Sequence, residues 1–237
     1  MPKDTFNNLP EEKRRQILDI AIKEFAEHPY NVASISKIVR KAGIAKGSIY
    51  QYFENKKELY RYLVKLSSDE KMKLAKDLPA PDHSSGLFGY LRWQFLSEVY
   101  FEIRHPNMAQ IAFRAFVEGD PFPEMTEELR RRGTTQFFKQ LITQGIMHGE
   151  VEHWVDPDVA AFLLECVFYQ FGRYFIKRLN LTAQDFEERD IYKDEEAQHL
   201  LDNLMNIIEA GMKQEPESRK GESAVIVRSG RTISNTN

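Results

Sequence analysis

The chain has 237 residues, with 33 Lys and Arg against 36 Asp and Glu, so its formal net charge is −3. This length is enough for one large domain or two small ones, each with its own core. We expect neither a secretion signal nor an apolar run of the ~18–20 residues that cross a bilayer. The single cysteine, Cys166, excludes an intrachain disulfide and fits a cytoplasmic protein, and its apolar neighbours predict a buried thiol.

The charges are divided unevenly along the chain. Residues 1–76 contain 16 basic and 10 acidic side chains, a balance of +6, whereas the remaining residues contain 17 and 26, a balance of −9. This asymmetry is typical of a basic segment that meets an anion, joined to an acidic segment that does not.

Helix signals follow one another closely in the basic segment. Residues 10–28 repeat apolar side chains with a helical period, and a proline ends the pattern. Ser34 is a suitable N-cap for a short helix, and Gly43 then suits a tight turn with a left-handed backbone. A second short helix carries Ile49, Tyr50, Tyr52 and Phe53, and a longer helix opens at Asn55. Two short helices joined by a turn, with a third behind them, form the helix-turn-helix pattern.

The acidic segment is also helical, and strand signals are nearly absent. Residues 78–86, rich in Pro and Ser, form the clearest linker of the chain. Residues 214–237 are polar and are predicted to be a disordered tail. Between these two segments we expect five further helices, at about residues 87–104, 107–118, 124–148, 157–180 and 195–213.

The second short helix carries the residue types that contact DNA. In a helix-turn-helix this helix enters the major groove with its N-terminal residues at the base edges. Lys46 suits a guanine edge or a phosphate, and Gln51 suits adenine. Hydroxyl groups and the N-terminus of the following helix suit phosphate oxygens. The predicted DNA-contacting residues are Ser34, Lys37, Ala45, Lys46, Gly47, Ser48, Tyr50, Gln51, Tyr52 and Lys56.

The order and spacing of these residues resemble the DNA-binding domain of the tetracycline-repressor (TetR) family over residues 17–63. The shared pattern comprises Ile17-Leu18-x-x-Ala21-x-x-x-Phe25, Ser34-Ile35-x-x-Ile38, Ala42-Gly43-Ile44-x-x-Gly47-Ser48-Ile49-Tyr50-x-Tyr52-Phe53 and Lys56-x-x-Leu59. Ala45 departs from it, because the family usually has Ser or Thr there, and a side-chain N-cap worth roughly 1 kcal/mol is lost.

The resemblance implies an all-α fold with three parts. An N-terminal three-helix DNA-binding domain (1–56) is joined by a long fourth helix to a larger helical ligand-binding and dimerisation domain (57–213), and the tail (214–237) follows. It also implies a non-enzymatic transcription regulator that binds a palindromic operator in double-stranded DNA as a homodimer. Members of the family usually repress transcription until a small molecule releases them from DNA, so the resemblance also implies this behaviour. We expect no membrane contact, cofactor or metal.

Aromatic residues are frequent in the ligand-binding segment and indicate either a packed core or a lipophilic pocket. Few charges accompany them, which favours an apolar or aromatic effector. Effector binding is expected to shift the helices next to residues 57–76 and so to move the DNA-binding domains off their groove spacing. The predicted pocket residues are Trp93, Phe101, Phe113, Phe137 and Phe171.

The last two predicted helices carry the expected dimer surface, because the equivalent pair forms the dimer interface in the family. A dimer places two recognition helices about 34 Å apart, the spacing of successive major grooves. Part of this apolar surface fits an intrachain core equally well. The predicted dimer residues are Phe162, Val167, Phe171, Leu201, Leu204 and Ile208.

Two other functions fit the sequence less closely. A metal sensor would use His148, Glu152 and His153, which lie one turn apart only if a helix continues through Gly149. An interaction protein would keep the fold with weak DNA affinity. An enzyme has no support, because the chain lacks a nucleophile elbow, a phosphate-binding glycine-rich loop and a Cys-x-x-Cys pair.

Overall fold

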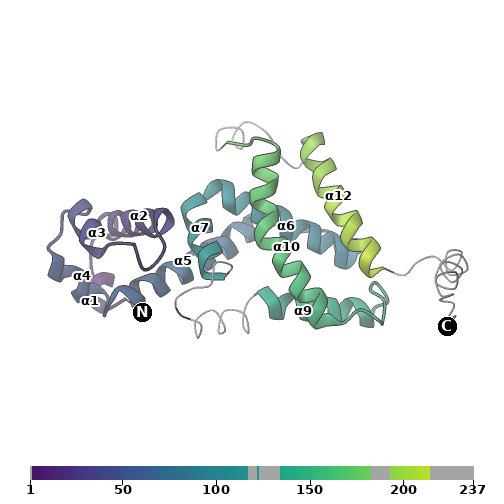
Figure 1. Cartoon of the computed structure of the whole chain (residues 1–237), viewed down its shortest axis with the longest axis horizontal. Helices are drawn as coiled ribbons and strands as arrows, with labels where there is room; N and C mark the ends of the chain where they lie inside the picture. The colour runs from purple at the N-terminus through teal and green to yellow at the C-terminus, as the bar shows by residue number, and fades with distance from the viewer. Residues whose placement is uncertain (1, 117–121, 123–133, 183–192, 214–237) are drawn as a thin grey trace, which may run out of the picture.

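The computed structural model describes residues 2–116, 122, 134–182 and 193–213, and every regular element in these ranges is helical (Figure 1). The predicted all-α fold is confirmed. The elements are α1 (Asp4–Asn7), α2 (Glu11–Glu27), α3 (Ile35–Lys41), α4 (Lys46–Tyr52), α5 (Lys56–Asp77), η1 (His83–Ser85), α6 (Gly86–Arg104), α7 (Pro106–Phe116), α9 (Thr134–Met147), α10 (Pro157–Arg178) and α12 (Glu195–Met212).

Side-chain caps explain why several predicted boundaries are close to the observed ones. The Ser34 hydroxyl accepts from the Lys37 N–H at the start of α3, and the Asn55 side chain accepts from the Glu58 N–H at the start of α5. Asp156 caps α10 in the same way. Such caps are local sequence signals. Residues 124–133 of a predicted helix and the predicted tail at 214–237 lie outside the described residues.

The head is formed by α1 to α4 and the first half of α5, at the left of Figure 1. Its core also receives two side chains from α7, Ile111 and Ala115, which are fully buried. The packing of the head therefore does not stop at residue 56, because α5 and α7 complete it. The other large side chains at its centre are Phe6, Ile17, Phe25, Ile38, Ile49, Phe53, Leu59 and Leu63.

The body is formed by α6, α9, α10 and α12, and α10 packs against both α6 and α9. By length and mean hydropathy, 1.3 over 18 residues, α10 has the composition of a membrane span, which the sequence analysis did not expect. A core helix of a globular domain has the same composition. Its inward face, including Leu164, Phe168 and Phe175, lies at the centre of the body core, so packing within the chain accounts for part of the hydropathy.

Candidate DNA interface and regulatory core

The turn between α3 and α4 is closed by a left-handed glycine. Gly43 has φ +63°, a conformation that other residues adopt at a cost. The Ile44 N–H donates to the Val39 carbonyl oxygen at 3.1 Å, which ends α3 and directs the chain into α4. Gly43 therefore makes the tight helix-turn-helix geometry possible.

The exposed face of α4 gathers four of the predicted DNA-contacting residues. Lys46, Gly47, Tyr50 and Gln51 are all exposed, and their spacing places them on one side of the helix. Ser48 beside them is half-buried. The opposite side carries the buried Ile49. The start of α4 has no side-chain cap at Ala45, which is exposed, as the departure from the family pattern predicts.

The start of α3 is held by a buried carboxylate that the sequence analysis missed. Glu24 of α2 is 1% exposed, and its Oε1 accepts from the Ser34 N–H at 3.0 Å. Lys37 Nζ lies 3.9 Å from the same oxygen. Ser34 and Lys37, both predicted to contact DNA, therefore also make contacts that position α3.

Two other predicted DNA-contacting residues lie against intramolecular partners. Lys56 Nζ lies 4.6 Å from the centre of the Tyr30 ring. Burial lowers the pKa of Lys56, and the nearby Glu24 carboxylate opposes this effect. Tyr52 is half-buried, with its ring 5.7 Å from that of Phe6. The structure thus separates these two residues from the exposed face of α4.

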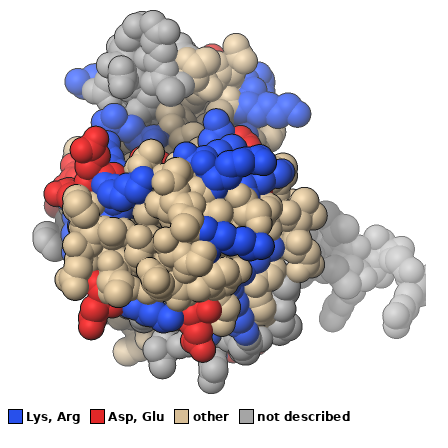
Figure 2. Space-filling model, turned by 90° about the vertical axis from the view of Figure 1, so that its left-hand side faces the viewer, with Lys and Arg blue, Asp and Glu red and all other residues tan. Residues whose placement is uncertain are grey.

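Basic side chains are spread over the head. Figure 2 looks onto this end of the molecule and shows Lys and Arg across the surface, with most Asp and Glu toward its left and lower edges. The exposed basic residues near α4 in the sequence are Lys37, Arg40, Lys41 and Lys46. A surface of this kind attracts the phosphate backbone of DNA.

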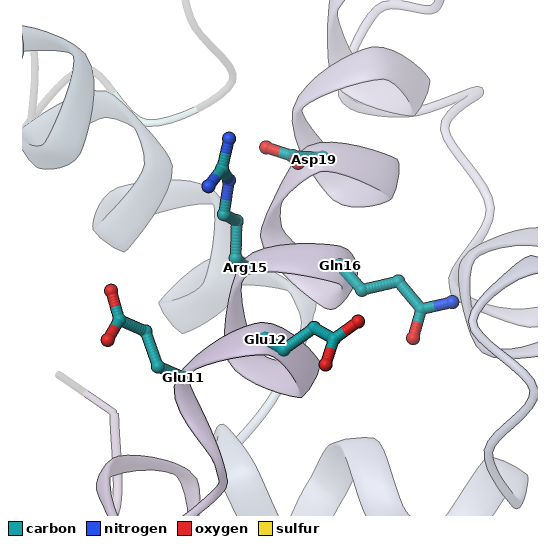
Figure 3. A pocket seen from close by; sticks show the side chains of 5 residues that line it. All are labelled: Glu11, Glu12, Arg15, Gln16 and Asp19. Atoms are coloured by element: carbon teal, nitrogen blue, oxygen red, sulfur yellow. The ribbon is translucent and has the colours of Figure 1, made fainter.

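A surface depression on α2 has a different character. It has a volume of about 580 Å³ and opens to solvent. Its lining contains three carboxylates and one guanidinium group, which disfavours a phosphate ligand. The lining residues, all on α2 (Figure 3), are Glu11, Glu12, Arg15, Gln16 and Asp19.

The body interior contains ion pairs, so the expectation that few charges accompany its aromatic residues is wrong. Glu98 and Glu102 of α6 are both buried. Lys71 of α5 pairs with Glu98, and Lys71 Nζ lies 4.4 Å from the centre of the Phe168 ring. Burial and the neighbouring Glu98 raise the pKa of Glu102 to about 7. The two carboxylates are one helical turn apart, and each needs a cation from another helix.

Arg173 of α10 provides the cation for Glu102 and reaches α7 at the same time. Its Nε lies 3.4 Å from Glu102 Oε1, and its Nη2 donates to Gln110 Oε1 at 2.9 Å. The guanidinium carbon lies 3.6 Å from the centre of the Phe113 ring. Arg173 therefore joins α6, α7 and α10.

Arg114, which follows Phe113 on α7, joins the body to the head. Arg114 Nη1 donates to the carbonyl oxygens of Phe25 and Ala26, each at 2.9 Å. These oxygens belong to the last turn of α2, where carbonyl groups lack partners inside the helix. The sequence predicts a connection between the effector and DNA only through the helices next to residues 57–76, whereas the structure adds this contact through α7.

The predicted pocket residues have different neighbours. Trp93 and Phe137 both lie near Tyr90, with ring centroids at 5.5 and 6.0 Å. Phe113 packs on Arg173, as described above, while Phe101 and Phe171 are buried. Phe171 packs edge-to-face on Phe95 in the core, with ring centroids 5.7 Å apart. Trp93 and Phe137 are therefore the two candidates that share a neighbouring ring.

Half of the predicted dimer residues belong to the intrachain core instead. Phe171, Leu201 and Ile208 are buried inside the single chain, so they have little surface to offer a partner. Phe162 is 60% exposed, and Val167 and Leu204 are half-buried. Other exposed apolar residues on the same two helices were missed: Val159, Leu163, Tyr174 and Ile207.

Cys166 is exposed, so the prediction of a buried thiol is wrong. It follows Phe162 and Leu163 at helical spacing and shares their outward face.

The one-turn spacing of His148 and Glu152 that a metal sensor would require does not exist, because α9 ends at Met147 and Gly149 has φ +74°. His153 Nδ1 lies 3.2 Å from Glu152 Oε2. Among the described residues, no group of three His, Cys, Asp or Glu side chains is arranged to hold a metal ion.

Comparisons with known proteins identify both parts of the chain. The family model described as "Bacterial regulatory proteins, tetR family" matches residues 17–63, and the model described as "Tetracyclin repressor-like, C-terminal domain" matches residues 85–213. A TetR family transcriptional regulator from Chloroflexus aurantiacus J-10-FL is 37% identical, with a TM-score of 0.78, and the match covers 91% of this chain and 100% of that chain.

Two matches concern fatty-acid regulators. The fatty acid metabolism regulator protein of Bacillus subtilis (strain 168) is 26% identical over an alignment of 163 positions, and the match covers 62% of this chain and 75% of that protein. The structure of the transcriptional regulator FadR from Bacillus subtilis in complex with stearoyl-CoA has the same fold, with a TM-score of 0.61 at 18% identity, and covers 83% of this chain and 98% of that chain.

Proposed function

Because the chain belongs to the TetR family of DNA-binding transcription regulators, we propose that it is a cytoplasmic homodimeric repressor that leaves a palindromic operator when a fatty-acyl thioester binds in the body. The observation that carries DNA binding is the exposed face of α4, where Lys46, Gly47, Tyr50 and Gln51 lie together. Gly47 has no side-chain carbon and so permits close approach of the backbone, and the long polar side chains of Lys46 and Gln51 suit base edges in the groove.

The DNA-binding proposal is tested on duplexes that the wild-type protein selects from a random pool. Lys46→Ala is expected to weaken binding to operator and unrelated duplex alike and to lower the salt slope by about 1, because one phosphate contact is lost. Gln51→Ala is expected to cost roughly 1–3 kcal/mol on the operator only. Lys76→Ala is the control, since α5 places it about 30 Å along the helix from Lys56. Wild-type binding by both α4 variants contradicts the proposal.

The dimer proposal is supported by the outward apolar face of α10 and α12. Phe162, Leu163 and Ile207 are 60%, 52% and 73% exposed in the single chain. Phe162 and Leu163 are neighbours on α10, and exposed apolar patches are typical of protein interfaces. Leu163→Glu is expected to give a monomer in sedimentation velocity and to weaken operator binding, because two linked heads are needed for two half-sites. Val32→Glu in the head, at a position 63% exposed, is the matched control. A dimeric Leu163→Glu protein contradicts this assignment.

The effector proposal combines the body interior with the names of the two fatty-acid regulators. Lys71 is paired with Glu98 and Arg173 with Glu102, so each buried carboxylate has a cationic partner. A long apolar chain among the surrounding rings then leaves these pairs intact, whereas an unpaired buried charge is costly. These features favour an acyl chain over a small polyanion.

Release from DNA tests the effector class. Stearoyl-CoA is expected to dissociate the protein from its selected duplex, and a tenfold loss of affinity requires about 1.4 kcal/mol of coupling. Free coenzyme A at the same concentration is the control and is expected to leave the complex intact. Equal release by both compounds, or release by neither, contradicts an acyl effector without affecting the DNA-binding proposal.

A further inference from the structure

The last carbonyl groups of α4 are bonded by residues from the N-terminus of the chain. A helix leaves its last four carbonyl oxygens without partners inside the helix. At the end of α4, the Phe53 N–H donates to the Ile49 oxygen at 2.8 Å. The other three oxygens each accept one hydrogen bond. These run from Lys3 Nζ to the Tyr50 oxygen at 2.9 Å, from Thr5 Oγ1 to the Gln51 oxygen, and from the Lys3 N–H to the Tyr52 oxygen at 2.9 Å.

An aromatic residue fixes these N-terminal residues to the head. Phe6 of α1 is fully buried, and its ring centroid lies 4.9 Å from that of Phe53, directly after α4. Arg14 Nη1 of α2 donates to the Asn7 oxygen at 3.2 Å. The contacts with α4 are thus part of the folded head.

The length and sequence of α4 explain why these contacts matter. Helices of seven residues are marginal on their own, and Ala45 supplies no cap at the other end. The ammonium group of Lys3 lies at the C-terminal end, where a positive charge favours the helix dipole. The carbonyl groups that are held belong to Tyr50, Gln51 and Tyr52, and two of these residues present exposed side chains on the DNA-binding face.

We propose that residues 3–6, the N-terminal arm, position the recognition helix by capping its C-terminal end. Lys3 and Thr5 are positioning residues, because they act on DNA binding through Tyr50 and Gln51. The inference rests on α4 being the recognition helix. It extends the DNA-binding unit beyond the segment that the family model matches, which begins at residue 17.

Thr5→Val removes one cap at constant side-chain shape, and Thr5→Ser keeps the hydroxyl as the matched control. Thr5 is exposed, so neither change creates a core cavity. In Thr5→Val, hydrogen exchange of the α4 amides is expected to accelerate, and affinity for the selected operator to fall roughly threefold to tenfold, which corresponds to one lost hydrogen bond. Affinity for an unrelated duplex is expected to stay within twofold, because no phosphate contact is lost.

The outcomes separate this inference from the proposed function. Wild-type exchange and wild-type operator affinity in Thr5→Val overturn the capping role. Equal losses on operator and unrelated duplex, with unchanged exchange, also overturn it, because they indicate a direct phosphate contact. If wild-type protein selects no duplex, the DNA-binding proposal fails, and exchange of the α4 amides still decides whether the arm caps α4. Deletion of residues 2–5, which leaves Phe6 in place, is the second variant and is expected to exceed the effect of Thr5→Val.

Discussion

Replacing Glu102 with Gln alters the charge of the body interior without altering its shape. Glu102 is buried on α6, one turn from Glu98, and burial together with Glu98 raises its pKa to about 7 from an ordinary 4.5. Lys71 and Arg173 face the two carboxylates from α5 and α10. These cations do not fully offset the burial of two negative charges.

The pKa sets both the sign and the size of the effect. As pH rises, the unfolded chain loses the Glu102 proton near pH 4.5 and the folded chain near pH 7. In this interval the folded state binds more protons, so the free energy of unfolding falls as pH rises. At 1.36 kcal/mol for each pH unit, the loss reaches about 3 kcal/mol above pH 7. Glu102→Gln cannot ionise and therefore escapes this loss.

Denaturation at pH 5 and pH 8 measures the difference. The variant is expected to match the wild-type protein at pH 5 and to exceed its free energy of unfolding by up to about 3 kcal/mol at pH 8. Arg173 keeps Gln110 and the Phe113 ring as partners. Glu54→Gln, at an exposed position, is the control and is expected to show no such difference. If Glu102→Gln differs from wild type by the same amount at both pH values, burial of an ionisable Glu102 is not the cause.

Three further substitutions test the head. Ala45→Ser supplies the missing N-cap of α4 and is expected to raise the free energy of unfolding by roughly 1 kcal/mol in urea denaturation; no gain contradicts the absence of a cap. Gly43→Ala is expected to lower the free energy of unfolding by about 1–2 kcal/mol. The cause is the φ of +63° alone, because no atom lies within 4 Å of the added Cβ. An unchanged denaturation midpoint would refute the strained turn. Arg114→Met removes the hydrogen bonds to Phe25 and Ala26 and is expected to cost about 2 kcal/mol, with faster exchange at the end of α2 as the specific sign.

Local signals account for what the sequence predicted correctly. Ser34, Gly43 and Asn55 each contact or constrain residues close by in the sequence. A short segment of sequence is therefore enough to predict the two ends of α3 and the start of α5. The N-terminal arm lacks such a signal, because Lys3 and Tyr50 are 47 residues apart. The burial of Glu24 also depends on a residue outside its own helix, because Glu24 lies on α2 and its partner Ser34 caps α3.

Helices with apolar residues on several sides explain the errors in the body. On α10 both Phe162 and Phe171 are large and apolar, yet the first is exposed and the second is buried. Periodicity places them on different faces but does not state which face meets the rest of the chain. For the same reason, the predicted dimer residues on α12 include Leu201, which is buried, and omit Ile207, which is exposed. The burial of Glu98 and Glu102 was not predicted, because charges are rarely buried without partners and the partners, Lys71 and Arg173, come from distant helices.

The C-terminal ends of α2, α3 and α4 are each bonded by another element, which bears on how the proposed release from DNA is transmitted. Lys13 of α2 donates to the Ala42 oxygen at the end of α3 at 2.7 Å, the N-terminal arm caps α4, and Arg114 of α7 bonds the end of α2. The first two contacts join α1 to α4 into one unit. The third joins this unit to α7, which Arg173 connects to α6 and α10. We expect a ligand that shifts α10 relative to α6 to act on Arg173 and through it on α7, which is a second connection to the head beside α5.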